Sequence, residues 1–492
     1  MVCFLRGIWY NIHNIAQRPL RRPRAIFRKE GRINMSSAPV SKNMAEGSIV
    51  RWIVSLAAPA VVAQVINLLY NVVDRIYIGH MPGVGATALT GVGLCMPILM
   101  LVNAFAMLAG AGGAPRAAIA MGRGDNESAE RITGNCLTVL LGIAVVLTAV
   151  FYAFAPQLLR LFGASDATLP YALSYTRIYV LGSVFVLVVL GMNPFITTQG
   201  FAKFSMLTTV IGAVCNIILD PILIFGLNMG VSGAAVATVL SQGVSAVWVI
   251  LFLCGERTRL RLRLPNLRPR LKVILPCLAL GVSSFVMIST ESLLSISFNA
   301  SLSGYGGDVA VGAMTIITSV SQLISMPIQG MCQGGQPLIG YNFGAGKADR
   351  VKRAFACQFG ICVGYAFLFW IAVMSVPQLF VNIFNSDPEL VEYTVWGMRI
   401  YMVGIFASGF QTSCQQAFVA LGQAKVSLLL ACERKLILLI PLIFILPLFM
   451  PDNKVFAVFL AEPVSDILAA ATTVTVFMTR FNKILKNGPG KA

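Results

Sequence analysis

Long apolar stretches, each nearly free of charge, alternate with short polar segments along most of the chain. The clearest of them cover residues 97–111, 137–155, 178–194, 205–227, 360–377 and 436–451. Stretches of this length and uniformity are typical of helices that cross the hydrocarbon core of a membrane. Strands of a membrane barrel would instead alternate polar and apolar residues over short segments. The pattern therefore predicts an all-α membrane protein with about twelve spanning helices, at roughly 52–79, 85–112, 131–155, 171–198, 203–226, 231–254, 272–302, 309–335, 353–378, 390–420, 425–450 and 454–479.

The second half of the chain repeats the first. A shift that aligns equivalent positions of the two halves places Gly112, Gly113, Pro115, Gly122, Gly124 and Arg131 on Gly334, Gly335, Pro337, Gly344, Gly346 and Arg353. A slightly shorter shift places Pro59 on Pro276 and Asp74 on Glu291. We therefore expect two six-helix lobes. Because six is even, both lobes should insert with the same orientation, related by a pseudo-twofold axis along the membrane normal.

This repeat predicts the domain organisation. We expect a basic, disordered N-terminal arm (1–50), an N-lobe with helices 1–6 (51–254), a cytoplasmic linker (255–271), a C-lobe with helices 7–12 (272–480) and a cytoplasmic tail (481–492). The segment RPLRRPRAIFRKEGR within the arm is rich in arginine and lacks the apolar core of a signal peptide. A disordered arm, an upstream extension before translation from Met35 and a transit peptide all fit this composition.

Glycine and proline gather at the end of the second predicted span of each half, in AGAGGAPRAAIAMGRG (109–124) and MCQGGQPLIGYNFGAG (331–346). At this density they break regular structure. We expect the proline to end each span at the inner face and the glycines to let helix ends approach closely. A tight loop without a further role is the alternative.

The formal net charge of +18 first suggests a nucleic-acid partner. The basic residues follow membrane topology instead, because a cytoplasmic N-terminus leaves all but seven of the 37 Lys and Arg at the inner face. The exceptions are Arg75, Arg160, Arg177, Arg399, Arg434, Lys435 and Lys454. We therefore expect membrane lipids and no nucleic acid as partners. The expected location is the bacterial inner (plasma) membrane, with a multi-pass monomer whose termini are both cytoplasmic.

The chain lacks residues that several classes of function require. The chain has eleven scattered cysteines without a CxxC motif, and its only histidines are His13 and His80. A histidine-ligated metal or haem site is therefore not expected. Neither histidine lies in a span interior and no GxSxG motif is present, so we expect no enzyme. The GAGKA sequence at 344–348 lacks the Walker pattern, which argues against ATP as the energy source.

Three blocks of sequence resemble multidrug and toxic compound extrusion (MATE) transporters of the prokaryotic type. They are GGQPLIGYNFGAG (334–346), LYNVVDRIYIGH (69–80) and NIILDPILIFG (216–226), and the resemblance extends from about residue 50 to residue 480. It implies a twelve-helix, two-lobe exporter driven by a proton or sodium gradient, without a resident cofactor. The implied cargo is small and amphiphilic, often cationic drugs or toxic compounds.

Six carboxylates lie inside predicted spans, where a charge costs roughly 2.5–3.5 kcal/mol and usually marks an ion or substrate path. They are Asp74, Asp220, Glu291, Glu433, Glu462 and Asp466. Asn216 and Asp220 are four residues apart, so both side chains lie on one helix face. The resemblance implies an N-lobe cation site that consists of Asp74, Asn216, Asp220 and Thr238, which can hold Na⁺ or share a proton. A polar clamp between helices, without titration, is the alternative role for these four residues. The resemblance also implies a bend of the first helix at Pro59.

Glu291 is the repeat mate of Asp74 and, by resemblance, a C-lobe cation ligand. The second acid that some family members carry near the end of span ten is absent from ALGQAK (420–425), which makes a two-carboxylate site doubtful. Arg434 and Lys435 are adjacent and cannot face each other on a helix, so they need other partners. Glu462 and Asp466 lie one turn apart, and we interpret them as packing or gating residues.

Uncharged polar residues and one methionine within the apolar spans are candidates for the wall of a substrate cavity. They are Gln64, Asn67, Asn193, Gln199, Met287, Ser325 and Gln329. Hydrogen bonds between helices explain such residues equally well. We therefore expect a cation-coupled antiporter. A lipid-linked oligosaccharide flippase or polysaccharide exporter of the same superfamily is the alternative, although it should carry several cleft cations for phosphate. A channel is a further rival, without a filter-like loop to support it.

Overall fold

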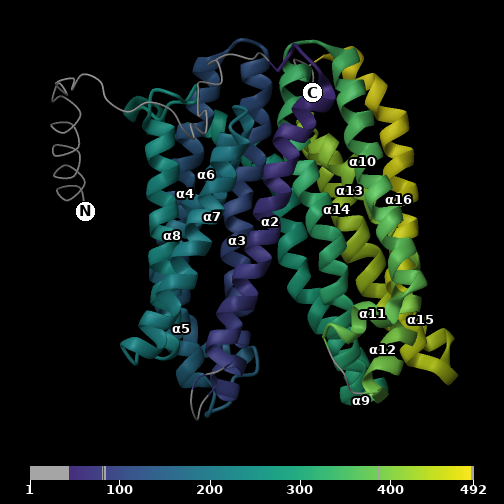
Figure 1. Ribbon diagram of the computed structural model, residues 1–492. Coiled ribbons are helices and arrows are strands. Elements are labelled where there is room, and N and C mark those ends of the chain that lie inside the picture. The colour runs from purple at the N-terminus through teal and green to yellow at the C-terminus, as the bar shows by residue number, and fades with distance from the viewer. Residues whose placement is uncertain (1–43, 80, 82–84, 385–387, 489–492) are drawn as a thin grey trace, which may run out of the picture. The chain divides into compact units, whose positions relative to one another are not determined.

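The computed structural model describes residues 44–79, 81, 85–384 and 388–488 (Figure 1). Within this part of the chain every regular element is a helix, as expected for the all-α class. In chain order the elements are α2 (Ile49–Gly79), α3 (Gly85–Gly122), α4 (Asn126–Leu161), α5 (Leu169–Leu181), α6 (Ser183–Thr198), α7 (Ala202–Pro221), η1 (Ile222–Gly226), α8 (Val231–Cys254), η2 (Leu264–Leu267), α9 (Leu271–Gly344), α10 (Ala348–Ser375), α11 (Pro377–Asn382), α12 (Pro388–Tyr401), η3 (Met402–Gly404), α13 (Ala407–Ala420), α14 (Ala424–Cys432), η4 (Glu433–Leu439), α15 (Ile440–Phe449), η5 (Pro451–Asn453) and α16 (Lys454–Asn487).

Nine helices of the described chain are long and apolar enough to cross a membrane, and the pair α5 and α6, bent by 55°, would make a tenth. One long element, α9, holds two of the nine, because Gly307 has a left-handed φ of 65° and joins two separate helices. The predicted spans at 390–420 and 425–450 are helical but interrupted, the first by η3 and the second by η4. These interruptions explain why neither passes as a single long helix.

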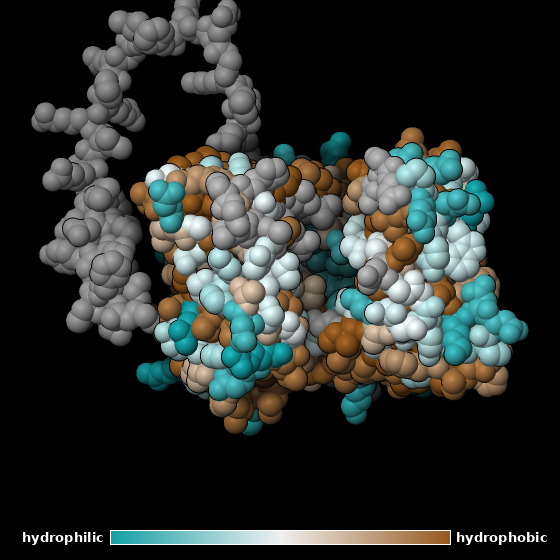
Figure 2. All heavy atoms as spheres, turned by 90° about the horizontal axis from the view of Figure 1, so that it is seen from below, coloured by the Kyte–Doolittle hydropathy of each residue, from teal (hydrophilic) through white to brown (hydrophobic). Residues whose placement is uncertain are grey.

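The helices form two groups that follow the two halves of the sequence. Figure 1 shows α2–α8 on one side and α9–α16 on the other, in contact toward one end and apart toward the opposite end. One cluster of buried apolar side chains lies almost wholly within the first group and a second lies within the second group. A third cluster joins the groups, through Leu56 and Ala57 of α2 and Leu338, Ile339 and Phe343 of α9. Viewed from the separated end, the space-filling surface has a hollow between the two masses (Figure 2).

The prolines of the two clusters do not end their helices, so that part of the expectation is wrong. Helix α3 continues through Pro115 to Gly122, and α9 continues through Pro337 to Gly344. Proline is tolerated inside a membrane helix because neighbouring groups satisfy the backbone that it frees. The glycines let the helix ends of the two halves approach closely, as expected: a Cβ on Gly122 would lie 2.0 Å from the Tyr341 carbonyl oxygen, and one on Gly344 would lie 2.1 Å from the oxygen of Ile119.

Residues 44–48, the N-terminal strap, bind the second group of helices. Arg350 donates to three strap carbonyl groups, those of Met44, Glu46 and Gly47, at 3.2, 3.2 and 3.0 Å. Lys347 Nζ donates to the Ala45 carbonyl at 3.0 Å. Residues 44–50 of the expected N-terminal arm are therefore folded, whereas residues 1–43 lie outside the described chain. At the other terminus α16 continues to Asn487, beyond the expected end of the C-lobe.

Candidate functional site

Three helices of the first group bring the four predicted N-lobe cation ligands together. Asp74 comes from α2, Asn216 and Asp220 from α7, and Thr238 from α8, and all four side chains are buried. Asn216 Nδ2 donates to Asp220 Oδ1 at 3.2 Å, as the four-residue spacing predicts. The charges of Asp74 and Asp220 are close enough to act on each other. The two carboxylates therefore belong to one site.

Local backbone features set the position of these side chains. Helix α7 ends at Pro221, which has no N–H to donate, and the chain continues as the π-helix η1. Gly233 of α8 packs against this turn, since a Cβ there would lie 2.8 Å from the Leu223 carbonyl carbon and oxygen. This close approach brings α8, and with it Thr238, next to the end of α7 that carries Asp220.

Several buried oxygen atoms of this site have no hydrogen-bond partner within the described chain. They are Oδ1 of Asn216, Oδ2 of Asp220 and Oγ1 of Thr238. A buried polar atom left unsatisfied costs about 1–3 kcal/mol, so such atoms usually await a ligand or a proton. Carboxylate, amide and hydroxyl oxygens are hard donors, which suit Na⁺ or H⁺ and not a soft transition metal. The donor set therefore fits the predicted coupling ion.

Tyrosines complete the site, and sequence reasoning missed them. Tyr70, Tyr175 and Tyr179 lie within electrostatic reach of the two carboxylates or of each other. The rings of Tyr175 and Tyr179 stack with centroids 6.2 Å apart. The hydroxyl groups of Tyr70 and Tyr175 lie beside Thr238, without a donor–acceptor geometry good enough for a hydrogen bond to its Oγ1. The sequence could have identified Tyr70, because it precedes Asp74 by one helical turn and therefore lies on the same face of the helix.

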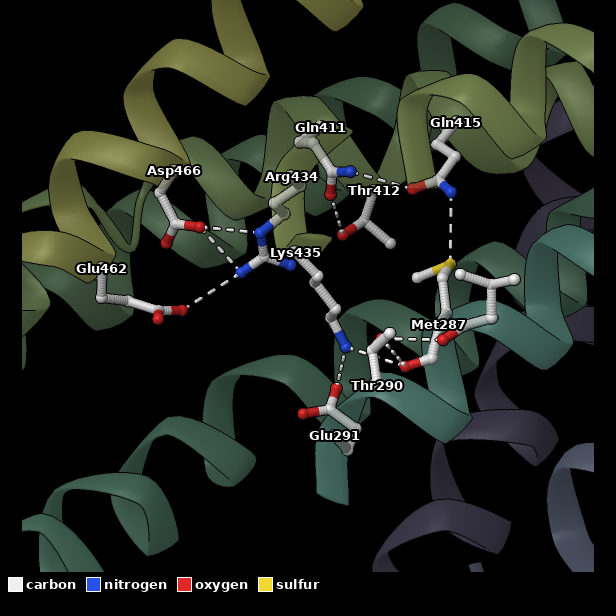
Figure 3. Close-up of polar contacts among 11 residues, drawn as sticks. Met287, Thr290, Glu291, Gln411, Thr412, Gln415, Arg434, Lys435, Glu462 and Asp466 are labelled. Atoms are coloured by element: carbon white, nitrogen blue, oxygen red, sulfur yellow. Dashed lines mark hydrogen bonds and ion pairs between the residues drawn. The ribbon is translucent and has the colours of Figure 1, made fainter. Parts of the chain in front are cut away.

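The second group of helices contains a different kind of charged site (Figure 3). Arg434 Nε donates to Asp466 at 2.8 Å, and its Nη2 lies 2.7 Å from Asp466 and 3.4 Å from Glu462. Lys435 Nζ pairs with Glu291 and also donates to the Met287 carbonyl at 3.0 Å. These contacts supply the partners that the sequence could not name for Arg434 and Lys435.

The π-helix η4 directs these two adjacent cations to different helices. Arg434 contacts two carboxylates of α16, whereas Lys435 contacts α9. Ser465 also donates to the carbonyl of Arg434 at 3.0 Å, which ties η4 to α16 through the backbone. Glu291, predicted as a cation ligand, already has the ammonium group of Lys435 as its partner. This arrangement makes it a member of an internal ion pair.

The predicted cavity residues divide into two classes. Four of them hold other parts of the chain. Asn193 donates to the Ser205 carbonyl at 3.2 Å, Gln64 to Gln333 at 3.3 Å, and Met287 accepts from Gln415 at 3.2 Å. Gln199 lies at the end of α6, where its Oε1 accepts from Thr258 Oγ1 and two backbone N–H groups of the linker.

The remaining predicted residues keep surface that a cargo could reach. Asn67 and Gln329 are exposed and Ser325 is partly exposed, although each lies inside a long apolar helix. Gln64 adds a contact between the two groups of helices, because its partner Gln333 belongs to α9. Pro59, the predicted bend, is buried inside α2, which is helical from Ile49 to Gly79.

Comparisons with known proteins match most of the chain. A family model described as MatE matches twice, over residues 59–222 and 283–445. A multidrug export protein MepA of Staphylococcus haemolyticus is 24% identical over 431 residues, covering 86% of this chain and 93% of MepA. The MepA of Staphylococcus saprophyticus is 24% identical over 438 residues, covering 88% and 95%.

Solved structures share this fold. The structure described as MATE in the bent conformation has a TM-score of 0.85 at 24% identity, over 91% of this chain and 99% of that chain. An outward-facing multidrug resistance MATE family transporter of the MOP superfamily has a TM-score of 0.83 at 23% identity, over 91% and 99%.

Proposed function

The chain belongs to the MatE family, and on that premise we propose that it is a plasma-membrane antiporter that exports small amphiphilic compounds, many of them cationic, in exchange for H⁺ or Na⁺. The multidrug export proteins among its relatives support the cargo class. The long apolar helices support the location. We further propose that both termini are cytoplasmic, as the distribution of basic residues predicts.

The proposed architecture has twelve spanning helices in two six-helix lobes, related by a pseudo-twofold axis along the membrane normal. The duplicated match of the family model supports this repeat. The glycine contacts support it as well, since Gly122 meets Tyr341 while its repeat mate Gly344 meets Ile119, the repeat mate of Tyr341. Two bundles that touch at one end and enclose a hollow at the other suit alternating access.

One observation carries the coupling proposal: two buried carboxylates of the first lobe share a site in which neighbouring oxygen atoms have no hydrogen-bond partner among the described residues. Asp74 and Asp220 interact electrically, and Asn216 and Thr238 add neutral oxygens. A bound cation or proton would compensate the charge of the pair. When the cation or proton leaves, the two carboxylates repel each other, and this repulsion favours a rearrangement of the three helices. The ion therefore has different affinities for the two arrangements, which coupling requires.

The cycle then follows from linkage. A cation enters from the outer side, binds the carboxylates of the first lobe and favours the state that releases cargo outward. When the cation leaves toward the cytoplasm, the opposite state binds the next cargo. The affinity difference between the two states limits how strongly the cation can drive the cycle.

Efflux from proteoliposomes tests this proposal. A fluorescent cationic dye is loaded, and its exit is followed under an imposed pH or Na⁺ gradient. Asp74→Asn and Asp220→Asn should each abolish gradient-driven efflux, while Asp166→Asn, which changes an exposed carboxylate, should behave as wild type. The coupling assignment is wrong if either buried variant, correctly inserted, exports as fast as wild type.

The identity of the ion needs a separate measurement. Replacing Na⁺ by choline at fixed pH removes one candidate and leaves the proton gradient unchanged. Loss of efflux assigns Na⁺ as the coupling ion, and unchanged efflux assigns H⁺.

A flippase or polysaccharide exporter receives less support. Such a protein needs cations in its cleft to hold phosphate groups of the cargo. Arg434 and Lys435, the mid-span cations that the sequence offered, both have carboxylate partners. Their positive charge is therefore already compensated.

A further inference from the structure

The charged cluster of the second group of helices contains more negative than positive groups. Three carboxylates, Glu291, Glu462 and Asp466, face two cations, Arg434 and Lys435. Tyr401 of α12 lies near the same groups and carries no charge at ordinary pH. Among the described residues, the two most buried carboxylates of this cluster, Glu462 and Asp466, share one cation, Arg434. Uncompensated buried negative charge is costly, so this buried part of the cluster favours one additional positive charge.

Contact geometry identifies the carboxylate with the weakest compensation. Asp466 lies 2.7 and 2.8 Å from two nitrogen atoms of Arg434. Glu291 pairs with Lys435 and has 56% of its side chain exposed. Glu462 has one contact, 3.4 Å from an Arg434 nitrogen that lies closer to Asp466, while only 12% of its side chain is exposed. It is thus nearly as buried as Asp466 but far less neutralised.

We propose that Glu462 is a proton-binding site of the C-terminal half, separate from the carboxylates of the first group. The carboxylate forms an O–H bond with a proton taken from hydronium, which becomes water, and deprotonation to water reverses the step. When Glu462 is protonated, Arg434 pairs with Asp466 alone and the cluster is electrically neutral. The deprotonated form competes with Asp466 for the same guanidinium group.

The local structure can convert that competition into movement. Arg434 lies at the start of η4, whose π-helical turns hold the backbone less regularly than an α-helix does. Lys435 follows directly and is bonded to α9, so a displacement of Arg434 acts on the contact between η4 and α9. Glu462 precedes Pro463, against which Gly404 is packed with a Cβ position 2.7 Å from the proline Cα. This tight contact leaves η4 as the element that moves.

Infrared spectroscopy tests proton binding without transport. The carbonyl stretch of a protonated carboxyl group is recorded on the purified full chain across a pH series, in water and in deuterium oxide. The parent protein and every variant carry Asp74→Asn and Asp220→Asn, so the first site contributes no carboxyl band. The parent should show a band at neutral pH that Glu462→Gln removes and Glu462→Asp shifts in frequency.

Matched variants decide the assignment. Asp166→Asn, an exposed carboxylate, should leave the band unchanged. The assignment to Glu462 is overturned if the band persists in a Glu462→Gln variant that unfolds at the same temperature as the parent. It is also overturned if the band disappears in Asp466→Asn instead. If Glu462→Gln does not fold, an unshifted band in Glu462→Asp overturns it equally.

The role of this proton in transport rests on the proposed function, although its binding does not. In proteoliposomes, Glu462→Gln should lower the number of protons moved per dye molecule, while Asp220→Asn abolishes gradient-driven efflux. Loss of the infrared band together with normal efflux by Asp220→Asn would refute the proposed function and leave the proton site intact. An unchanged proton ratio in Glu462→Gln would refute its part in transport.

Discussion

The contact between the ends of α3 and α9 predicts a specific response to a single methyl group. Alanine at Gly122 would place its Cβ 2.0 Å from the Tyr341 oxygen, and alanine at Gly344 would place it 2.1 Å from the Ile119 oxygen, whereas ordinary contacts begin at 3.4 Å. The opposing atoms belong to the backbone of a helix and cannot rotate away. The helix ends must therefore separate by more than 1 Å, by roughly the difference between these distances.

The energetic cost follows from the known cost of overpacking. An inserted methyl group that forces backbone shifts costs about 1–3 kcal/mol. If the two groups of helices exchange between states closed and open at this end, the cost falls on the closed state. Each substitution should then shift the equilibrium toward the open state by about 5- to 150-fold. The alanines at Gly122 and Gly344 oppose different backbone atoms, so the double variant should shift the equilibrium further.

Spin labels report this shift directly. Labels on the exposed positions Asn126 and Asp349, in a cysteine-free background, measure the separation of the two groups by pulsed electron resonance. Gly122→Ala should enlarge the population with the longer distance. Gly142→Ala and Gly364→Ala serve as controls, because neither Cβ would have a neighbour within 4 Å. A distance distribution for Gly122→Ala that matches these controls would refute the reasoning, and a fall in unfolding temperature at unchanged distance would refute the exchange between states.

Three further predictions concern polar contacts. Arg350→Ala should destabilise the folded strap by roughly 1.5–3 kcal/mol, measured as faster hydrogen exchange of its amides. Arg350→Lys should recover little of this stability, because an ammonium group cannot reproduce the several donors of a guanidinium group. Arg434→Gln should lower the free energy of unfolding by about 3–5 kcal/mol, because it leaves buried carboxylates uncompensated, whereas the double variant Arg434→Met with Asp466→Leu should cost less in denaturant unfolding. Asp125 accepts from the Ser128 N–H at 2.9 Å, and Asp125→Ala should cost about 1 kcal/mol. The Ser128 side chain and, next, its N–H lower the pKa of Asp125. The contribution to stability is therefore full above the ordinary aspartate pKa and disappears as pH falls through the lowered value, which thermal unfolding across acidic pH would detect.

Much of the first site was predictable because its signals are local. Asn216 and Asp220 are one turn apart, and a turn of helix places them on the same face wherever that helix packs. Asp74 was found because it lies deep in an apolar stretch. A carboxylate is costly there and usually marks an ion or substrate path. Tyr175 and Tyr179 were missed since a buried tyrosine in a membrane helix resembles any other aromatic residue until its neighbours are known.

The second site could not be predicted, because its contacts depend on tertiary structure and on an irregular helix. Arg434 and its partner Asp466 come from different helices, and no spacing in the sequence relates them. The direction of Lys435 is set by η4, where the usual turn of 3.6 residues does not apply. Gln199 was misleading for a similar reason: Gly200, with a φ of 91°, turns the chain at that point and brings the amide to the linker.

The two halves share their glycine contacts but differ in how they compensate buried acids. Asp220 accepts its hydrogen bond from the neutral amide of Asn216, and among the described residues no cationic side chain forms an ion pair with it. Asp466 and Glu291 accept from a guanidinium and an ammonium group that the chain itself supplies. Asp74 and Glu291 are repeat mates, and the second half differs from the first in supplying Lys435 as the partner of its acid. An ion that drives transport must bind and leave, and a covalently attached cation cannot do so. The first half is therefore suited to exchange an external cation, and the second half can respond to the environment only through the single negative charge that its own cations leave unbalanced.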